Sequence, residues 1–465
     1  MKSFAMPMEI TRRINPLYAG WAVGTMGASL LLNTFSVATM FFLITILKVD
    51  PLLAGMLVMV SKLYDAASDP LMGYLSDRTQ SRWGRRRPYL MLGGVVSGIA
   101  FAALFAAPIS DGSTAHTLIV GGLLIFLSTG YTIFNVPYLA MPAEMIDDYH
   151  QRSVLMSYRV FLISIGTFAG ISGAPALVGF LQDSLGQAST DAYANMGVIA
   201  GFLIAIFMVA SFFGTKNARS TMHISSNISV REQLLFIASN KPFLLYLGIK
   251  LAGLFALAAI ISTQFFFVVY VLERSVSIVA LFGVMQLTGK LISLPIWLKI
   301  SKSKGKAWIL VASTIMFIPL AASWLVASSA EPLWIYALRG LLLGVATAGT
   351  LLGTQSMLPD IMEYDYLRSG LRREGIYAGV ASFIEKTSYA LAGISIGGFL
   401  SVMNFQKGLP PGSQPGSAVF AIIACTALIP IGAYVFKLLF LWFYDLNENK
   451  LQAARNAAAI PPAAG

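Results

Sequence analysis

Two aspartates stand four residues apart in an otherwise apolar stretch of the chain, YDAASDPLMGYLSDR. They are Asp65 and Asp69, and Ser68 and Pro70 lie beside them. On a helix this spacing places both carboxylates on one face, about one turn apart. Pro70 cannot donate a backbone hydrogen bond, which leaves the carbonyl oxygen one turn earlier available as a ligand. Two carboxylates, a hydroxyl and a carbonyl suit Na⁺, whereas two coupled carboxylates can instead share a proton.

The composition around this pair is that of a membrane protein. Hydrophobic residues make up 57% and charged residues 11% of the 465 residues, and the mean hydropathy is +0.73. Long apolar runs recur, as helices need to cross about 30 Å of hydrocarbon. Twelve such runs lie near residues 17–45, 53–77, 88–108, 117–142, 155–182, 194–214, 243–272, 277–298, 307–327, 332–360, 375–403 and 416–444. The sequence therefore predicts an all-α membrane protein with twelve transmembrane helices.

The distribution of basic residues predicts the orientation and excludes some functions. The chain has 32 Lys and Arg and a net charge of +11, and most of these bases fall in alternate loops and in both tails. The positive-inside rule makes those loops and both termini cytoplasmic, so the charge needs no nucleic acid to explain it. The single cysteine, Cys425, excludes an intrachain disulfide. We find no phosphate-binding loop or nucleophile–base pattern, so neither an ATP-driven pump nor an enzyme is expected, and no cofactor beyond a coupling ion.

Similar segments recur in the two halves of the chain. PAEMIDDYHQRS aligns with PDIMEYDYLRSG at an offset of 217 residues, and GRRRPYL aligns with GKAWIL at an offset of 221. Both matches join one apolar run to the run six places later. This predicts two six-helix bundles, 1–214 and 242–445, joined by a cytoplasmic linker at 215–241. Residues 446–465 are low in complexity and are expected to be disordered.

Two basic residues also lie deep in apolar runs. Arg159 and Lys386 need anionic partners at that depth, and Asp65 and Asp69 are the obvious candidates. Glu385 is a further acid in the same run as Lys386 and could pair with it or carry a proton. An alternative is that these charges pair only to stabilise helix packing, although a structural pair rarely needs two acids on one face.

Charged residues mark the predicted cytoplasmic ends of several runs. The sequence GYLSDRTQSRWGRRRPY predicts a tight turn after the second run, and similar loop positions follow the fourth and tenth runs. Such charges either reflect the positive-inside rule alone or lock a closed cytoplasmic face. The candidate gate residues are Gly73, Asp77, Arg78, Gly84, Arg85, Asp148, Arg152 and Asp365.

The segment YDAASDPLMGYLSDRTQSRWGRRRPY, the twelve-run layout and the half-chain repeat resemble the glycoside-pentoside-hexuronide:cation symporter family of the major facilitator superfamily. The resemblance covers nearly all of the chain except its tail. It implies two helical bundles around a central cavity that opens alternately to either side. It also implies a secondary active symporter that imports a glycoside or oligosaccharide with H⁺ or Na⁺. Such a protein would function as a monomer among the lipids of a bacterial inner membrane.

The resemblance also implies roles for individual residues. The cation site would be formed by Asp65, Asp69, Ser68, Asn135 and Ser382, and the two aspartates would bind the metal ion if coupling uses Na⁺. Lys386 would balance the charge of these acids, and Arg159 would hold the substrate.

Three positions depart from the family's best-known member. Ser29 replaces an acidic sugar ligand, Asn135 replaces a third acid of the cation site, and Leu139 replaces a tryptophan that stacks on the sugar. These departures favour proton coupling or a glycoside other than a simple galactoside. Amphipathic rings and amides suit sugar binding, and the candidates are Ser29, Asn33, Tyr131, Asn135, Tyr138, Tyr158 and Gln264.

Two other functions remain open on the sequence. Relatives of this family that carry lysolipids share the acids of the second helix and the lysine of the eleventh, so a lysolipid or other amphipath symporter is the alternative. A sensor or a scaffold that transports nothing is a third possibility, and the intact acid pair argues against it.

Overall fold

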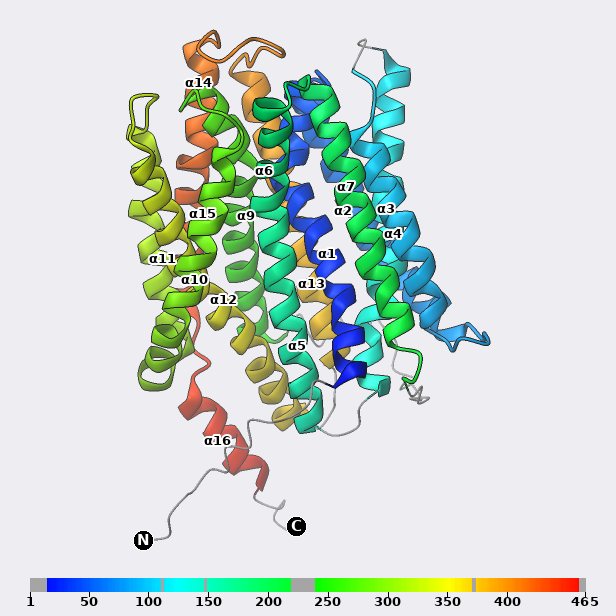
Figure 1. Ribbon diagram of the computed structural model, residues 1–465. Helices are drawn as coiled ribbons and strands as arrows, with labels where there is room; N and C mark the ends of the chain where they lie inside the picture. Colours follow the sequence, from blue (N-terminus) through cyan, green and yellow to red (C-terminus); the bar gives the residue numbers. More distant parts are fainter. Residues whose placement is uncertain (1–14, 110–112, 146–148, 219–238, 370–373, 460–465) are drawn as a thin grey trace.

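The computed structural model describes residues 15–109, 113–145, 149–218, 239–369 and 374–459. Within these residues every regular element is a helix, and the long helices lie side by side (Figure 1). The first half contains α1 (Pro16–Phe41) with η1 (Phe42–Ile46), α2 (Pro51–Arg78), α3 (Arg87–Phe105), α4 (Thr114–Met145), α5 (Tyr149–Phe168) with η2 (Ala169–Gly173), α6 (Ala174–Gly179) and η3 (Phe180–Ser184), and α7 (Ser189–Gly214).

The second half of the chain is also helical. It contains α9 (Lys241–Tyr270), α10 (Ile278–Lys304), α11 (Lys306–Ala322) with η4 (Ser323–Val326), α12 (Leu333–Ser369), α13 (Glu374–Val402), α14 (Gly416–Thr426), α15 (Leu428–Phe443) and α16 (Glu448–Ala459).

Each predicted apolar run coincides with one of these helical segments. In the described part of the chain, ten segments are long and apolar enough to cross a membrane. Helices α2 and α13 are as long but are not among the ten, because they carry the charged residues of the predicted site. Twelve spanning helices and cytoplasmic termini therefore stay predictions.

Local signals in the sequence start two of these helices. The side chain of Asn15 accepts hydrogen bonds from backbone amides of the first turn of α1, and Asp50 does the same for α2. Pro16 and Pro51 then occupy the first helical positions, where a missing amide hydrogen costs nothing. This fixes where α2, which carries the aspartates, begins.

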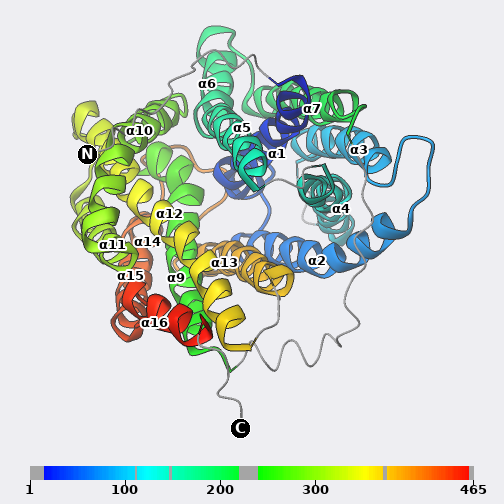
Figure 2. The same ribbon diagram turned by 90° about the horizontal axis from the view of Figure 1, so that it is seen from below.

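The helices form two groups that face each other across the molecule (Figure 2). On one side α3 packs against α4 and α7, and α1 packs against α5 and α7. On the other side α10 packs against α12, and α9 packs against α13 and α15. The groups meet mainly where α2 packs against α13 and α1 packs against α9. Most of the linker 215–241 lies outside the described residues, so the domain boundaries stay a prediction.

The contact between α2 and α13 is closest at the end of the molecule opposite α16 (Figure 1). A Cβ atom added to Gly397 would lie 2.1 Å from the carbonyl oxygen of Pro51, and one added to Gly55 would lie 2.7 Å from that of Gly393. Only glycine allows the two backbones to approach this closely.

Gly397→Ala is expected to force these helices apart and to destabilise the protein by about 1–3 kcal/mol, as overpacking does elsewhere. Thermal unfolding of the purified protein in detergent measures the effect. Gly379→Ala is the matched control on the same helix, because a Cβ atom there meets nothing within 4 Å. Unfolding temperatures that are equal for Gly397→Ala and the unmodified protein would contradict the close contact.

The C-terminal tail differs from its expected disorder, because residues Glu448–Ala459 form α16. The backbone amide of Lys450 donates to the side chain of Asn447, and the guanidinium of Arg455 donates to both carboxylate oxygens of Glu363 on α12, at 2.7 and 3.0 Å. Alanine has the highest helix propensity, so a segment can be low in complexity and still form a helix.

Candidate cation and substrate site

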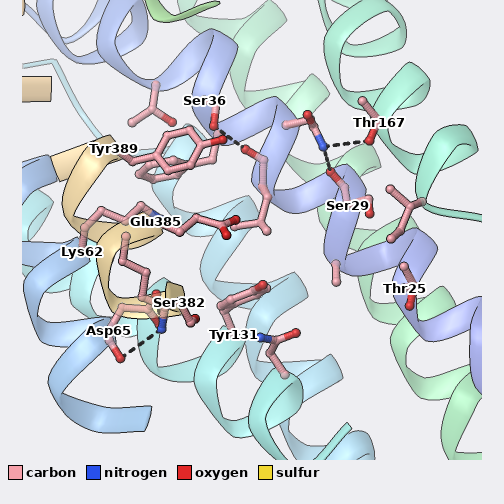
Figure 3. A pocket seen from close by; sticks show the side chains of 18 of the residues that line it. Thr25, Ser29, Ser36, Lys62, Asp65, Tyr131, Thr167, Ser382, Glu385 and Tyr389 are labelled. Atoms are coloured by element: carbon pink, nitrogen blue, oxygen red, sulfur yellow. Dashed lines mark hydrogen bonds and ion pairs between the residues drawn. The ribbon is translucent and has the colours of Figure 1, made fainter. Parts of the chain in front are cut away.

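A cavity of about 470 Å³ lies between the two groups of helices. Residues of α1, α2, α4 and α5 line it from one group, and residues of α9, α12 and α13 line it from the other. Figure 3 shows hydroxyl, aromatic and charged side chains projecting into this space. A cavity of this size with several convergent polar groups is suited to a small polar ligand.

The ammonium of Lys386 on α13 lies between the two aspartates of α2. Its Nζ atom is 3.0 Å from Oδ2 of Asp65, which Figure 3 labels, and it also contacts Oδ2 of Asp69. Thr132 on α4 donates to Oδ1 of Asp65 at 2.6 Å and lies 3.2 Å from Oδ1 of Asp69. One ammonium and one hydroxyl therefore offset the repulsion between two neighbouring carboxylates.

The two carboxylates differ in access. The side chain of Asp65 is 3% exposed and that of Asp69 is 27% exposed. The hydroxyl of Ser68 donates to the backbone carbonyl of Asp65 at 3.1 Å, and Lys386 reaches the same carbonyl at 3.3 Å. This carbonyl is one residue before the one that Pro70 leaves without its helical donor. The oxygens of one helical turn thus converge on a single cation.

Asn135 and Ser382 line the cavity together with Asp65. The region described contains no group of three or more His, Cys, Asp or Glu residues that could hold a metal ion. A Na⁺ site at Asp65 and Asp69 would therefore need hydroxyl, amide or carbonyl oxygens to complete it. Side chains such as those of Asn135 and Ser382 carry such oxygens.

Glu385 has a partner other than the one considered from the sequence. Its carboxylate pairs at 3.0 Å with the ammonium of Lys250 on α9, and not with the neighbouring Lys386. Adjacent residues of a helix point in different directions, so Glu385 and Lys386 face different partners. Lys250 therefore pairs with Glu385, whereas Lys386 pairs with the two aspartates of α2.

Arg159 lines the opposite part of the cavity from α5. Its Nε atom is buried and has no hydrogen-bond partner in the described part of the chain. The side chain of Asn33 donates to the carbonyl of Ser29 at 2.7 Å and to Thr167 at 3.2 Å (Figure 3). Ser29 and Tyr131 complete this polar wall. Arg159 therefore lines the cavity and carries a buried donor that has no acceptor among the described residues.

Tyr138 lines the cavity with a side chain that is held in place by neighbouring residues. Its ring stacks on Trp21 with centroids 4.7 Å apart, and its hydroxyl donates to the carbonyl of Trp21 at 2.8 Å and lies 2.6 Å from the hydroxyl of Thr25. Leu139 lies beside it at the surface of the cavity. The hydroxyl of Tyr138 is already satisfied by the protein.

Two residues expected to line the cavity do not. The hydroxyl of Tyr158 accepts from the backbone amide of Asn15 at 3.4 Å, near the start of α1. Gln264 is 1% exposed and is held by the carbonyl of Ile260 and the hydroxyl of Tyr336. Both side chains form hydrogen bonds within the protein instead, Tyr158 with the start of α1 and Gln264 with α9 and α12.

The candidate gate residues are spread over helix and loop. Gly73, Asp77 and Arg78 belong to α2 itself, which extends to Arg78, so the turn to α3 is shorter than expected. Gly84 lies in that turn with a φ of +89°, which glycine adopts readily. Arg85 follows it, and Asp365 lies on α12. Asp148 and the side chains of Asp77 and Arg152 lie outside the described residues, so a gate stays a prediction.

Three residues of the site were not singled out from the sequence. Thr132, Lys250 and Lys62 contact the aspartates, Glu385 and the ring of Phe35, respectively. Lys62 and Lys250 could have been found, since each is a charge inside an apolar run. A threonine in such a run carries no comparable signal.

The chain is similar to known membrane transporters over nearly its whole length. The family model described as MFS/sugar transport protein matches residues 20–448. The uncharacterized symporter YnaJ of Bacillus subtilis is 28% identical, over 93% of this chain and 92% of that protein. The putative glycoside/cation symporter YagG of Escherichia coli is also 28% identical, over 88% of this chain and 89% of that protein.

More distant similarities include another substrate class and a solved fold. The sodium-dependent lysophosphatidylcholine symporter 1-B of Danio rerio is 23% identical, over 89% of this chain and 84% of that protein. The structure of a bacterial homolog of the human lysosomal transporter Spinster, inward-facing and unoccupied, aligns with a TM-score of 0.66. It is 14% identical over 97% of this chain and all of that chain. A similarity at this level of identity shows a shared fold and not a shared substrate.

Proposed function

The chain belongs to the MFS/sugar transport protein family, and from this premise we propose that it imports a glycoside or oligosaccharide by symport with H⁺ or Na⁺. It is a multi-pass integral membrane protein with the helical fold of the major facilitator superfamily. The proposed symporter acts as a monomer in a bacterial inner membrane.

The observation that carries this proposal is the ammonium of Lys386 shared by Asp65 and Asp69 at the wall of the cavity. A charge that is not neutralised is costly in the membrane interior. A cation that binds to the aspartates, whether H⁺ or Na⁺, weakens their hold on Lys386. The balance of charge around the cavity then differs between the loaded and the empty site.

Transport of the sugar is coupled to transport of the cation if the protein can change conformation only when the charges around the cavity are balanced. Substrate and cation each alter the charge or hydrogen bonding around Lys386, so binding of one favours binding of the other. In this proposal the guanidinium of Arg159 donates a hydrogen bond to a substrate oxygen. Further donors and acceptors for the substrate come from Asn33, Tyr131 and Asn135. Asp65 and Asp69 select the cation, and Arg159 selects the sugar.

Counterflow in proteoliposomes tests the substrate class. Vesicles loaded with a candidate glycoside are expected to take up the same labelled glycoside, and Arg159→Gln is expected to lower this exchange about tenfold or more, as loss of a charged hydrogen bond does. Uptake with and without Na⁺, at fixed pH, separates the two coupling ions. No exchange of any glycoside by the active protein would contradict the proposed substrate class.

A second candidate function is symport of a lysolipid. The observation that favours it is the match to sodium-dependent lysophosphatidylcholine symporters over most of both chains. Exchange of lysophosphatidylcholine that sugars do not inhibit would support this candidate, and inhibition of that exchange by a glycoside would count against it.

A further inference from the structure

Among the described residues two acids line the cavity, Asp65 on α2 and Glu385 on α13, and they differ in what they can still bind. Thr132 donates to Oδ1 of Asp65 at 2.6 Å, and the ammonium of Lys386 lies 3.0 Å from its Oδ2. The side chain of Asp65 is 3% exposed, whereas that of Glu385 is 51% exposed. Protein groups thus occupy both oxygens of Asp65, and the carboxylate of Glu385 is the one that a ligand can reach.

The side chain of Glu385 projects from α13 into the cavity (Figure 3). Its Oε2 atom lies 3.0 Å from the ammonium of Lys250 on α9, which packs against α13. This ion pair balances the charge of Glu385 within the protein, which matters because an unbalanced charge is costly inside a membrane. The carboxylate can therefore accept further hydrogen bonds from a neutral ligand, and Lys250 holds it in one direction.

Arg159 and Glu385 bring complementary polar groups to the cavity from the two groups of helices. Arg159 lies on α5, and its buried Nε atom has no acceptor among the described residues. A guanidinium can only donate hydrogen bonds, a carboxylate can only accept them, and a hydroxyl does both. Neighbouring hydroxyls of a sugar ring can therefore donate to the carboxylate while other hydroxyls accept from the guanidinium.

We propose that the carboxylate of Glu385 accepts hydrogen bonds from hydroxyl groups of the transported sugar. This inference rests on the proposed symport of a glycoside. Hydrogen bonds to a charged acceptor are about twice as strong as those between neutral groups, so this contact contributes strongly to the choice of sugar. Glu385 is thus a specificity-determining residue of the substrate site, and Lys250 is its positioning residue.

This contact places sugar binding and cation binding at consecutive residues of one helix. Glu385 faces the cavity, and the next residue, Lys386, holds Asp65 and Asp69 on α2. A movement of α13 that brings Glu385 to the sugar also moves Lys386 relative to the two aspartates. The sugar and the cation can therefore affect each other's binding through α13.

Deoxy sugars test which hydroxyl groups contact the protein. Methyl β-D-glucoside and methyl β-D-glucuronide are the two parent sugars, and their deoxy analogues each lack one ring hydroxyl. Titration calorimetry of the purified protein measures the affinity of each. At least one deoxy analogue is expected to bind about tenfold or more weakly than its parent, as loss of a charged hydrogen bond does.

The variant Glu385→Gln shows whether that hydroxyl contacts Glu385. The amide keeps the shape and one acceptor oxygen of the side chain but loses the charge. The parent sugar should bind about threefold to tenfold more weakly to the variant. Removal of the critical hydroxyl should then cost only about threefold, because a neutral hydrogen bond is about half as strong. A residue that only stabilises the fold would not change the effect of one hydroxyl.

The matched control is Glu363→Gln. Glu363 also pairs with a base, Arg455, but it lies outside the cavity. Affinities for every sugar should equal those of the unmodified protein. Thermal unfolding of both variants shows whether each is folded.

Variants of Lys250 test its role in positioning Glu385. Lys250→Met removes the group that holds the carboxylate in one direction, so the cost of removing the critical hydroxyl should fall as it does in Glu385→Gln. Lys250→Arg keeps the charge and should keep that cost. An unchanged cost in a folded Lys250→Met would remove Lys250 from this role.

The outcomes distinguish this inference from the function on which it rests. Equal costs of every deoxygenation in Glu385→Gln and the unmodified protein would overturn the contact and leave glycoside symport intact. Unchanged sugar binding with lost accumulation in Glu385→Gln would assign Glu385 to the cation instead. No binding of either parent sugar, with exchange of lysophosphatidylcholine, would overturn both the contact and the glycoside function.

Discussion

In Asp69→Asn, the substrate is expected to equilibrate across the membrane but no longer to accumulate. The amide can keep the contact with Thr132, but it cannot take up a proton or offer a negative charge to Na⁺. A tenfold gradient of one coupled cation is worth about 1.4 kcal/mol and supports about tenfold accumulation of substrate. The steady-state ratio of internal to external substrate should fall from that value to about one, while exchange without a gradient continues.

The control for this prediction is an acid outside the cavity. Asp445→Asn removes a carboxylate that is half exposed and pairs with Lys450, so accumulation should match that of the unmodified protein. Full accumulation in Asp69→Asn would remove this residue from the coupling step. Loss of both exchange and accumulation would indicate damage to the fold, which thermal unfolding would reveal.

Lys386→Met is expected to destabilise the protein strongly. The substitution leaves Asp65 and Asp69 side by side without their shared ammonium, and Asp65 is 3% exposed. Loss of one member of a buried ion pair costs about 3–5 kcal/mol. The unfolding temperature of the purified protein should fall well below that of Thr387→Val, a change at the neighbouring residue, whose hydroxyl donates to the carbonyl of Phe383 in the same helix.

A second substitution tests the cause of that loss. Adding Asp69→Asn to Lys386→Met removes one of the two unpaired carboxylates and should restore part of the stability. Residues in direct contact deviate from additivity, so the double variant should be more stable than the two single changes predict. Strictly additive effects would mean that Lys386 and Asp69 do not stabilise each other.

Sequence reasoning located the parts of the site that follow from helix geometry and the cost of buried charge. The spacing of Asp65 and Asp69 places them on one face, and the need of Lys386 for an anion names them as its partners. The same reasoning could not rank polar neutral residues, because tyrosine and glutamine are found in packing and in cavities alike. Tyr158 and Gln264 lie away from the cavity for that reason.

Other features of the site depend on contacts between distant helices. Thr132 completes the aspartate pair only because α4 lies against α2, and Lys250 takes Glu385 only because α9 lies against α13. The close approach of α2 and α13 likewise depends on which glycines face each other. A single sequence contains no direct record of such pairings.

The most direct test of symport is to measure ion entry that depends on the sugar. Proteoliposomes that enclose a pH-sensitive or Na⁺-sensitive dye receive methyl β-D-glucuronide or methyl β-D-glucoside from outside, beside vesicles that contain Asp69→Asn. We predict that one sugar carries H⁺ or Na⁺ inward with the unmodified protein and carries neither ion with the variant. Sugar entry without any accompanying ion, in the presence of both ion gradients, would contradict the account.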